Sequence, residues 1–183
     1  SYINSFFKKS KNQKLATVRA GNVIGGGDYS EDRLISDIYR FAKKNKKIIL
    51  RNPNSTRPWQ HVLEPLSGYL LLAEKLNKNK LNKIDQNWNF GPNISNCKSV
   101  KYIANYFAKS LKLEIKIAKN NSKDFKPETS YLRLSNYKAR KVLKWHPRWS
   151  LNKSLNKILE WNRNAKSKGY KKMCEDQIKS YLS

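Results

Sequence analysis

The chain has 183 residues, enough for one medium domain with a hydrophobic core or for part of a larger one. Its formal net charge of +26 first suggests nucleic acid or an anionic membrane as a partner. The two cysteines and two histidines are too few to predict a disulfide framework or a metal site. The sequence has no long apolar run that would predict a signal peptide or a membrane span, so a cytoplasmic protein is expected.

The sequence predicts alternating strands and helices along the first half of the chain. Apolar residues at helical spacing predict a helix over residues 1–9, and the run over residues 15–24 predicts an inner strand of a parallel sheet, buried on both faces. Ser30 is expected to cap a helix that ends in lysines near residue 47. There follow a short strand at 48–50, an exposed turn-rich loop at 51–59, a helix at 63–76, and a strand that ends in a turn over 88–91.

The second half continues the same alternation. The pattern predicts a helix over 99–112, a strand over 113–119, an extended piece at 131–135, helices over 136–145 and 150–165, and a short helix at 174–182. Trp145, Pro147 and Trp149 are expected in the core. This order of elements is typical of an α/β protein. Because the chain starts inside a helix with no preceding strand, its beginning is interpreted as a cut edge.

The basic excess is mostly lysine, with 30 Lys against 9 Arg, and the lysines occur in every segment. Nucleic-acid sites gather their cations on one face, so this spread favours solvated lysines and does not favour nucleic acid, although a nucleic-acid or anionic-surface binding module remains the alternative. Arginine binds phosphate bidentately, so its clustering in the first third predicts an anionic ligand there. The arginines concerned are Arg19, Arg33, Arg40, Arg51 and Arg57.

Three contiguous glycines, Gly25 to Gly27, follow the first predicted strand. They do not fit the G-x-G-x-x-G fingerprint of a dinucleotide site. By themselves they predict a sharp turn in which a residue adopts positive φ.

Four stretches in order carry a more specific signal: "ATVRAGNVIGGGDYSEDRLI", "RNPNSTRPWQHVLEPLSGYLLLAEKL", "WNFGPN" and "YLRLSNYKARKVLKWHPRWSLNKSLNKILEW". Together they closely resemble the C-terminal half of CDP-glucose 4,6-dehydratases, which are extended short-chain dehydrogenase/reductases of the NAD-dependent epimerase/dehydratase family. The resemblance covers nearly the whole chain. The stretches "RPWQHVLEPLSGYL" and "RAGNVIGGGD" favour the CDP-glucose branch, with another nucleotide sugar as the alternative substrate.

The resemblance implies the C-terminal part of a Rossmann-type parallel sheet and a small α/β substrate-binding lobe. Residues 1–60 would be the remnant of the Rossmann core with a substrate loop, and residues 61–183 mainly the lobe. The family converts CDP-glucose to CDP-4-keto-6-deoxyglucose, a polysaccharide precursor, with tightly held NAD, and full-length members are expected to be homo-oligomers. The NAD fingerprint, the Tyr-x-x-x-Lys pair and the Asp/Glu dehydration pair would lie upstream, so this fragment is expected to bind the nucleotide sugar without catalysing its dehydration.

Carried over residue by residue, the resemblance implies binding roles and no catalytic or metal-binding residue. Asn22 would lie beside the nicotinamide and the substrate phosphates, and the amide of Val23 suits a diphosphate. Arg57 would bind the diphosphate bidentately. The complete predicted substrate set is Asn22, Val23, Arg33, Leu34, Ile49, Leu50, Arg51, Arg57 and Asn89, with Asn22 also reaching the cofactor.

A few positions are weaker candidates or depart from the family. His61 is expected to be a packed histidine, because nothing near it in sequence would orient a base. Tyr131 and Arg133 match late ligand contacts of relatives only loosely. Ser135 replaces a usual Asp, and Lys144 replaces the Gly common before the tryptophan.

Overall fold

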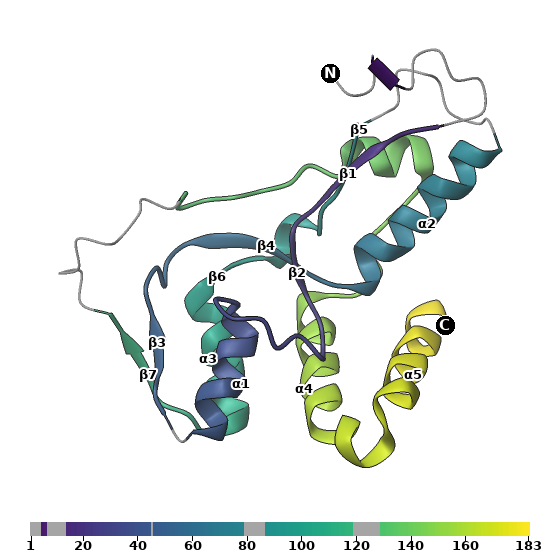
Figure 1. Ribbon diagram of the computed structural model, residues 1–183. Helices are drawn as coiled ribbons and strands as arrows, with labels where there is room; N and C mark the ends of the chain where they lie inside the picture. Colours follow the sequence, from purple (N-terminus) through teal and green to yellow (C-terminus); the bar gives the residue numbers. More distant parts are fainter. Residues whose placement is uncertain (1–4, 7–13, 45, 79–86, 119–128) are drawn as a thin grey trace.

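The computed structural model describes residues 5–6, 14–44, 46–78, 87–118 and 129–183 (Figure 1). The helix expected over residues 1–9 lies outside the described residues, apart from Ser5 and Phe6. Strands and helices alternate as predicted, which confirms the α/β class. The helices and strands are β1 (Thr17–Ala20), β2 (Asn22–Ile24), α1 (Leu34–Lys43), β3 (Ile48–Leu50), β4 (Thr56–His61), α2 (Leu63–Asn77), β5 (Asn87–Phe90), β6 (Cys97–Ser99), α3 (Val100–Leu111), β7 (Ile115–Ile117), α4 (Leu151–Lys168) and α5 (Tyr170–Leu182), with a 3-10 turn at Ile94–Asn96 and a π-helix at Ala139–Leu143.

The described strands form three small sheets. β1 pairs with β5 and β3 pairs with β7, both in parallel. In the third sheet the order is β2-β4-β6, with β2 and β4 parallel and β4 and β6 antiparallel. The parallel pairs are joined through helices, as parallel connections require.

The prediction of a single buried strand over residues 15–24 is wrong. The chain bends at Gly21, which separates β1 from β2 and places them in different sheets. The carbonyl of Pro58 approaches Gly21 so closely that a Cβ there would collide with it. Three of the four β1 residues are exposed, because in the described part of the chain β1 has a hydrogen-bonded neighbour on one side only.

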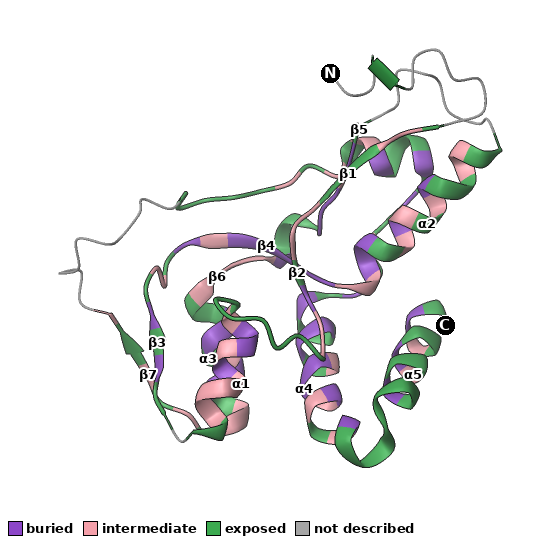
Figure 2. Cartoon of the chain, in the orientation of Figure 1, coloured by how far each residue is buried: buried purple, intermediate pink, exposed green. Residues whose placement is uncertain are grey.

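The largest core lies where α1, α3 and α4 meet the strands β3 and β4. α1 and α3 lie side by side at one end of the molecule, next to β3 and β7 (Figure 1). Ile38, Ile103, Phe107, Leu155 and Ile158 have no exposed surface. Their three- and four-residue spacing gives each helix one apolar face, which Figure 2 shows as the buried stripes of these helices.

A second core joins α2 and β5 to the π-helix and its following residues. Trp88 and Phe90 of β5 contact Leu143 and Trp145 there, and the Phe90 and Trp145 rings meet edge to face at 5.1 Å between centroids. The expected burial of Trp145 and Trp149 is confirmed, whereas Pro147 is only half-buried. The residue at the end of the π-helix, Lys144, has φ 59°, a left-handed conformation that explains why glycine suits this position.

The start of α1 and the extent of the loop before β4 also differ from the sequence predictions. α1 begins at Leu34 with Arg33 as its N-cap residue and without a capping side-chain hydrogen bond, so Ser30 does not cap it. The loop expected over residues 51–59 ends early, because Thr56 to Trp59 belong to β4. This strand is buried almost throughout, since it lies between β2 and β6.

Candidate functional site

A cavity of about 600 Å³ opens beside the end of β2 and the start of α1. Its walls come from β2, the loop before α1, the first turn of α1, and the buried strand β4. The volume is within the usual range for small-molecule sites. Five of the nine predicted substrate residues line it: Asn22, Val23, Arg33, Leu34 and Arg57.

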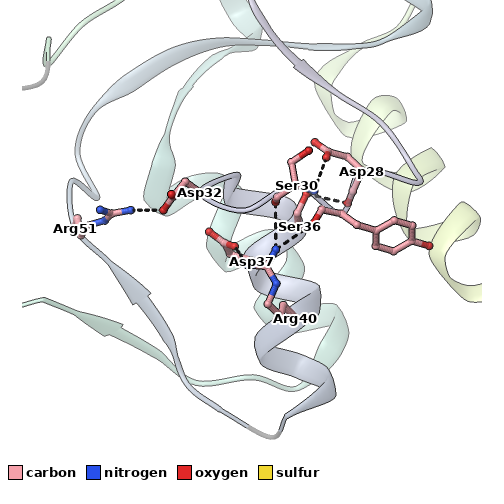
Figure 3. Close-up of polar contacts among 8 residues, drawn as sticks. Asp28, Ser30, Asp32, Ser36, Asp37, Arg40 and Arg51 are labelled. Atoms are coloured by element: carbon pink, nitrogen blue, oxygen red, sulfur yellow. Dashed lines mark hydrogen bonds and ion pairs between the residues drawn. The ribbon is translucent and has the colours of Figure 1, made fainter.

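The loop over residues 28–33 is held against α1 by two α1 side chains (Figure 3). The Ser36 hydroxyl donates to the carbonyl of Asp28 at 2.9 Å, and Arg40 Nη2 donates to the carbonyls of Tyr29 and Ser30 at 3.1 and 3.2 Å. Arg40 also pairs with Asp37 within the helix. Arg40 is one of the five arginines whose clustering predicted an anionic ligand, and in the structure it holds the loop that forms the cavity wall.

Asp28 gives the cavity a fixed negative group. Its carboxylate accepts the backbone N–H of Ser30 at 2.9 Å. This hydrogen bond, with the attraction of Arg33 as a smaller contribution, lowers the pKa of Asp28 below its usual value. The carboxylate is therefore ionised at neutral pH. In the sequence, Asp28 stands out only as an acidic residue directly after three glycines. Its place in the cavity wall depends on the path of the loop, which the sequence does not reveal.

The glycine run has two different structural roles. Gly25 lines the cavity, whereas Gly26 and Gly27 lie against the indole ring of Trp161 on α4. A Cβ at Gly26 would overlap that ring, and Gly27 has φ 81°. The predicted positive-φ turn is confirmed. Of the three glycines only Gly25 lines the cavity, because the other two allow α4 to approach.

Arg57 lies in a different environment from the one predicted. It is 7% exposed and belongs to β4 rather than to an exposed loop. Its Nη1 donates to the carbonyl of Thr129 at 2.7 Å and to that of Thr56 at 3.0 Å. The guanidinium therefore joins β4 to the segment at residue 129. Arg57 is also among the residues that line the cavity.

The remaining predicted substrate residues lie outside the main cavity lining. Ile49 and Arg51 line a second hollow between α1 and β3, whereas Leu50 is 2% exposed and packs in the core. Asn89 lies on β5 opposite Arg19, and its side-chain oxygen is buried without a hydrogen-bond partner. The assignment of these four residues to a ligand stays a prediction.

His61 is packed, as expected. It is 1% exposed, and its ring lies 4.8 Å from that of Trp149. Burial lowers the pKa of His61 to about 4.

The described residues contain no group of His, Cys, Asp and Glu side chains that could hold a metal ion. Across the same residues, no helix combines the length and apolar character needed to cross a bilayer.

Sequence comparison gives a close match. The chain is 42% identical over 167 residues to the CDP-glucose 4,6-dehydratase of Salmonella typhimurium. The chain is similar to one part of a CDP-glucose 4,6-dehydratase. The match covers 89% of this chain and 46% of that enzyme, so the chain spans about half the length of this relative. The resemblance to CDP-glucose 4,6-dehydratases inferred from the motifs is thus confirmed. No protein-family model matches the chain.

Solved structures show the fold at lower sequence identity. An epimerase of Methanothermobacter thermautotrophicus has a TM-score of 0.69 with 16% identity, over 95% of this chain and 48% of its own. The dTDP-glucose 4,6-dehydratase of Bacillus anthracis in complex with NAD has a TM-score of 0.64 with 19% identity, over 81% and 44%. The UDP-glucuronic acid 4-epimerase of Bacillus cereus, bound to UDP-glucuronic acid and NAD, has a TM-score of 0.63 with 18% identity, over 77% and 42%. The fold is the Rossmann-like one of these dehydratases and epimerases.

Proposed function

We propose that this chain forms the nucleotide-sugar-binding part of a CDP-glucose 4,6-dehydratase. The observation that carries the proposal is the cavity beside β2, which brings Asn22, Arg33 and Arg57 together from three separate elements. The 42% identity to a CDP-glucose 4,6-dehydratase supports CDP-glucose as the nucleotide sugar. In the proposed complex Arg33 and Arg57 face the diphosphate, since forked guanidinium groups match phosphate oxygens.

The proposal assigns binding, and not proton or hydride transfer, to these residues. NAD would supply the hydride acceptor and donor of such a dehydration. The sequence contains no G-x-G-x-x-G, and of its residues only Asn22 is proposed to reach the cofactor. The two Tyr-x-x-x-Lys pairs with described structure, Tyr39 with Lys43 and Tyr137 with Lys141, do not line the main cavity. In this proposal the described residues contribute to binding the nucleotide sugar, and none of them is assigned a catalytic step.

Calorimetric titration of CDP-glucose into the purified chain tests the proposal. Arg33→Ala removes an exposed guanidinium at the cavity and should weaken binding by about 1.5–3 kcal/mol, the range for hydrogen bonds to charged groups. Arg163→Ala is the matched control, because Arg163 is also exposed but lies on α4 and bonds Ser110. The chain alone should not turn over CDP-glucose. Absence of CDP-glucose binding, or equal losses in both variants, would overturn the proposal.

A further inference from the structure

A second hollow of about 410 Å³ adjoins the main cavity. Asp32 lines both, so it forms the wall between them. The hollow lies between α1 and β3, and its apolar surface comes from Phe41, Ile48 and Ile49. Ile49 is 58% exposed, so its side chain offers an accessible apolar surface in this hollow. An apolar surface bordered by charged side chains suits a flat ring with polar edges, such as a nucleobase.

The polar edge of this hollow is an ion pair between Asp32 and Arg51. Arg51 Nη2 donates to Asp32 Oδ1 at 3.2 Å (Figure 3). The two side chains come from different elements, the loop before α1 and the end of β3. Both are well exposed, at 84% for Asp32 and 67% for Arg51. An ion pair exposed to this degree adds little to folding stability.

The backbone of Asp32 is strained. Its φ is 58°, in the left-handed region that residues other than glycine rarely adopt, although Asp and Asn tolerate it best. Such conformations persist where the surrounding structure enforces them, and they gather at ligand sites. Ser36 and Arg40 hold the preceding part of the same loop through the carbonyls of residues 28–30. With this backbone conformation the Asp32 carboxylate lies beside the Arg51 guanidinium at the junction of the two hollows.

We propose that Asp32 and Arg51 select a cytosine base over uracil by reading its edge, an inference that rests on the proposed function. An ionised carboxylate only accepts hydrogen bonds and a guanidinium only donates them. Cytosine presents its amino donor beside the N3 acceptor, so Asp32 accepts from the amino group while Arg51 donates to N3. Carboxylates are known acceptors for this amino group in nucleic-acid recognition.

Uracil presents the opposite order. Its O4 acceptor would face the Asp32 carboxylate, and its N3–H donor would face the Arg51 guanidinium, so both contacts would be unfavourable. Adenine shares the cytosine order of donor and acceptor, and the CDP-glucose relative favours the pyrimidine. With the base on Ile49, the diphosphate would extend past Asp32 into the main cavity toward Arg33.

The test is calorimetric titration of CDP and of UDP into the purified chain and three variants. The wild type should bind CDP at least tenfold more tightly than UDP. Asp32→Asn should reduce this ratio to within about threefold, because a carboxamide can turn either its oxygen or its NH₂ group to the base. Asparagine also tolerates the left-handed backbone, so this variant should stay folded. Arg51→Leu should likewise reduce the ratio.

Asp176→Asn is the matched control. Asp176 forms an exposed ion pair with Lys172 on α5 and lines neither hollow, so this variant should keep the wild-type ratio. Equal affinity of the wild type for CDP and UDP, or an unchanged ratio in Asp32→Asn, would overturn this inference and leave the proposed function standing. Failure of the wild type to bind CDP and CDP-glucose would instead overturn the proposed function, and this inference with it.

Discussion

The carboxylate of Glu64 accepts the backbone N–H of Trp149 at 2.7 Å, a contact across 85 residues of sequence. Its other oxygen accepts the N–H of Arg148 at 3.0 Å and the hydroxyl of Tyr181 at 2.7 Å. Burial raises the pKa of Tyr181, so its phenol stays protonated and donates. Glu64 is 1% exposed, and this one buried group joins α2 to the segment before α4 and to the end of α5.

Glu64→Gln should lower the free energy of unfolding by about 1.5–3 kcal/mol, the range for hydrogen bonds to a charged group. The amide keeps one acceptor oxygen, and its NH₂ group would face a donor. Urea denaturation at pH 7 measures the effect. Glu74→Gln, on the same helix but in an exposed pair with Lys78, should change stability by less than about 0.5 kcal/mol. Equal effects in the two variants would contradict the account.

His61 should make stability depend on pH. Burial lowers its folded pKa to about 4 from about 6.5 in the unfolded chain, so the unfolded state binds more protons between these values. The neutral ring therefore stabilises the fold above pH 6.5, and this contribution is lost as the pH falls toward 4. Between pH 7 and pH 5 the loss should be about 2 kcal/mol.

Urea denaturation of the wild type and of His61→Gln at pH 7 and pH 5 checks this dependence. The variant has no imidazole at this position, so the pH dependence from His61 should disappear even though the variant is less stable overall. His146→Gln is the control, since His146 is exposed, and it should keep the wild-type dependence. A His61→Gln protein with an unchanged loss between pH 7 and pH 5 would show that another group titrates.

The sequence predicted most elements but not their burial. Periodicity found α2 and α3 almost to the residue, because each has one apolar face against a core. It missed β4 because "STRPWQH" contains Arg57 and Pro58, which local rules assign to a loop, whereas pairing on both sides makes the segment a buried strand. It also joined β1 to β2, since the close approach of Pro58 to Gly21 is a tertiary contact.

The sequence likewise predicted part of the candidate site. Family motifs identified Asn22, Arg33 and Arg57, which the fold brings to one cavity. Asp32 and Ser36 were not identified, because their roles depend on the path of the loop before α1 and on contacts across it. Polar residues in loops have no periodicity that would indicate which way they face.

Arg57→Lys should affect both folding and ligand binding. The sequence placed Arg57 in an exposed loop, where a substitution would leave folding unchanged, but the side chain is buried and donates to the carbonyl of Thr129. Loss of the guanidinium geometry should lower the free energy of unfolding by about 1–3 kcal/mol and weaken CDP-glucose binding by a similar amount. Denaturation without ligand and calorimetry on the folded variant measure the two effects separately.

Lys78→Ala is the control for Arg57→Lys, since Lys78 lies exposed at the end of α2 and pairs with Glu74. It should alter neither quantity beyond about 0.5 kcal/mol. If the folded Arg57→Lys protein binds CDP-glucose as the wild type does, Arg57 is a structural residue, and Asn22 and Arg33 remain as candidates for the diphosphate.

Hydrogen exchange with and without saturating CDP-glucose tests the central claim most directly, because it maps the ligand onto the chain without any substitution. Slower amide exchange is expected over residues 21–36 and 56–60, which contribute the cavity walls, and unchanged exchange over α5, which contributes none. Protection absent from these two segments, or spread over the lysine-rich surface, would contradict the placement of a nucleotide sugar in this cavity.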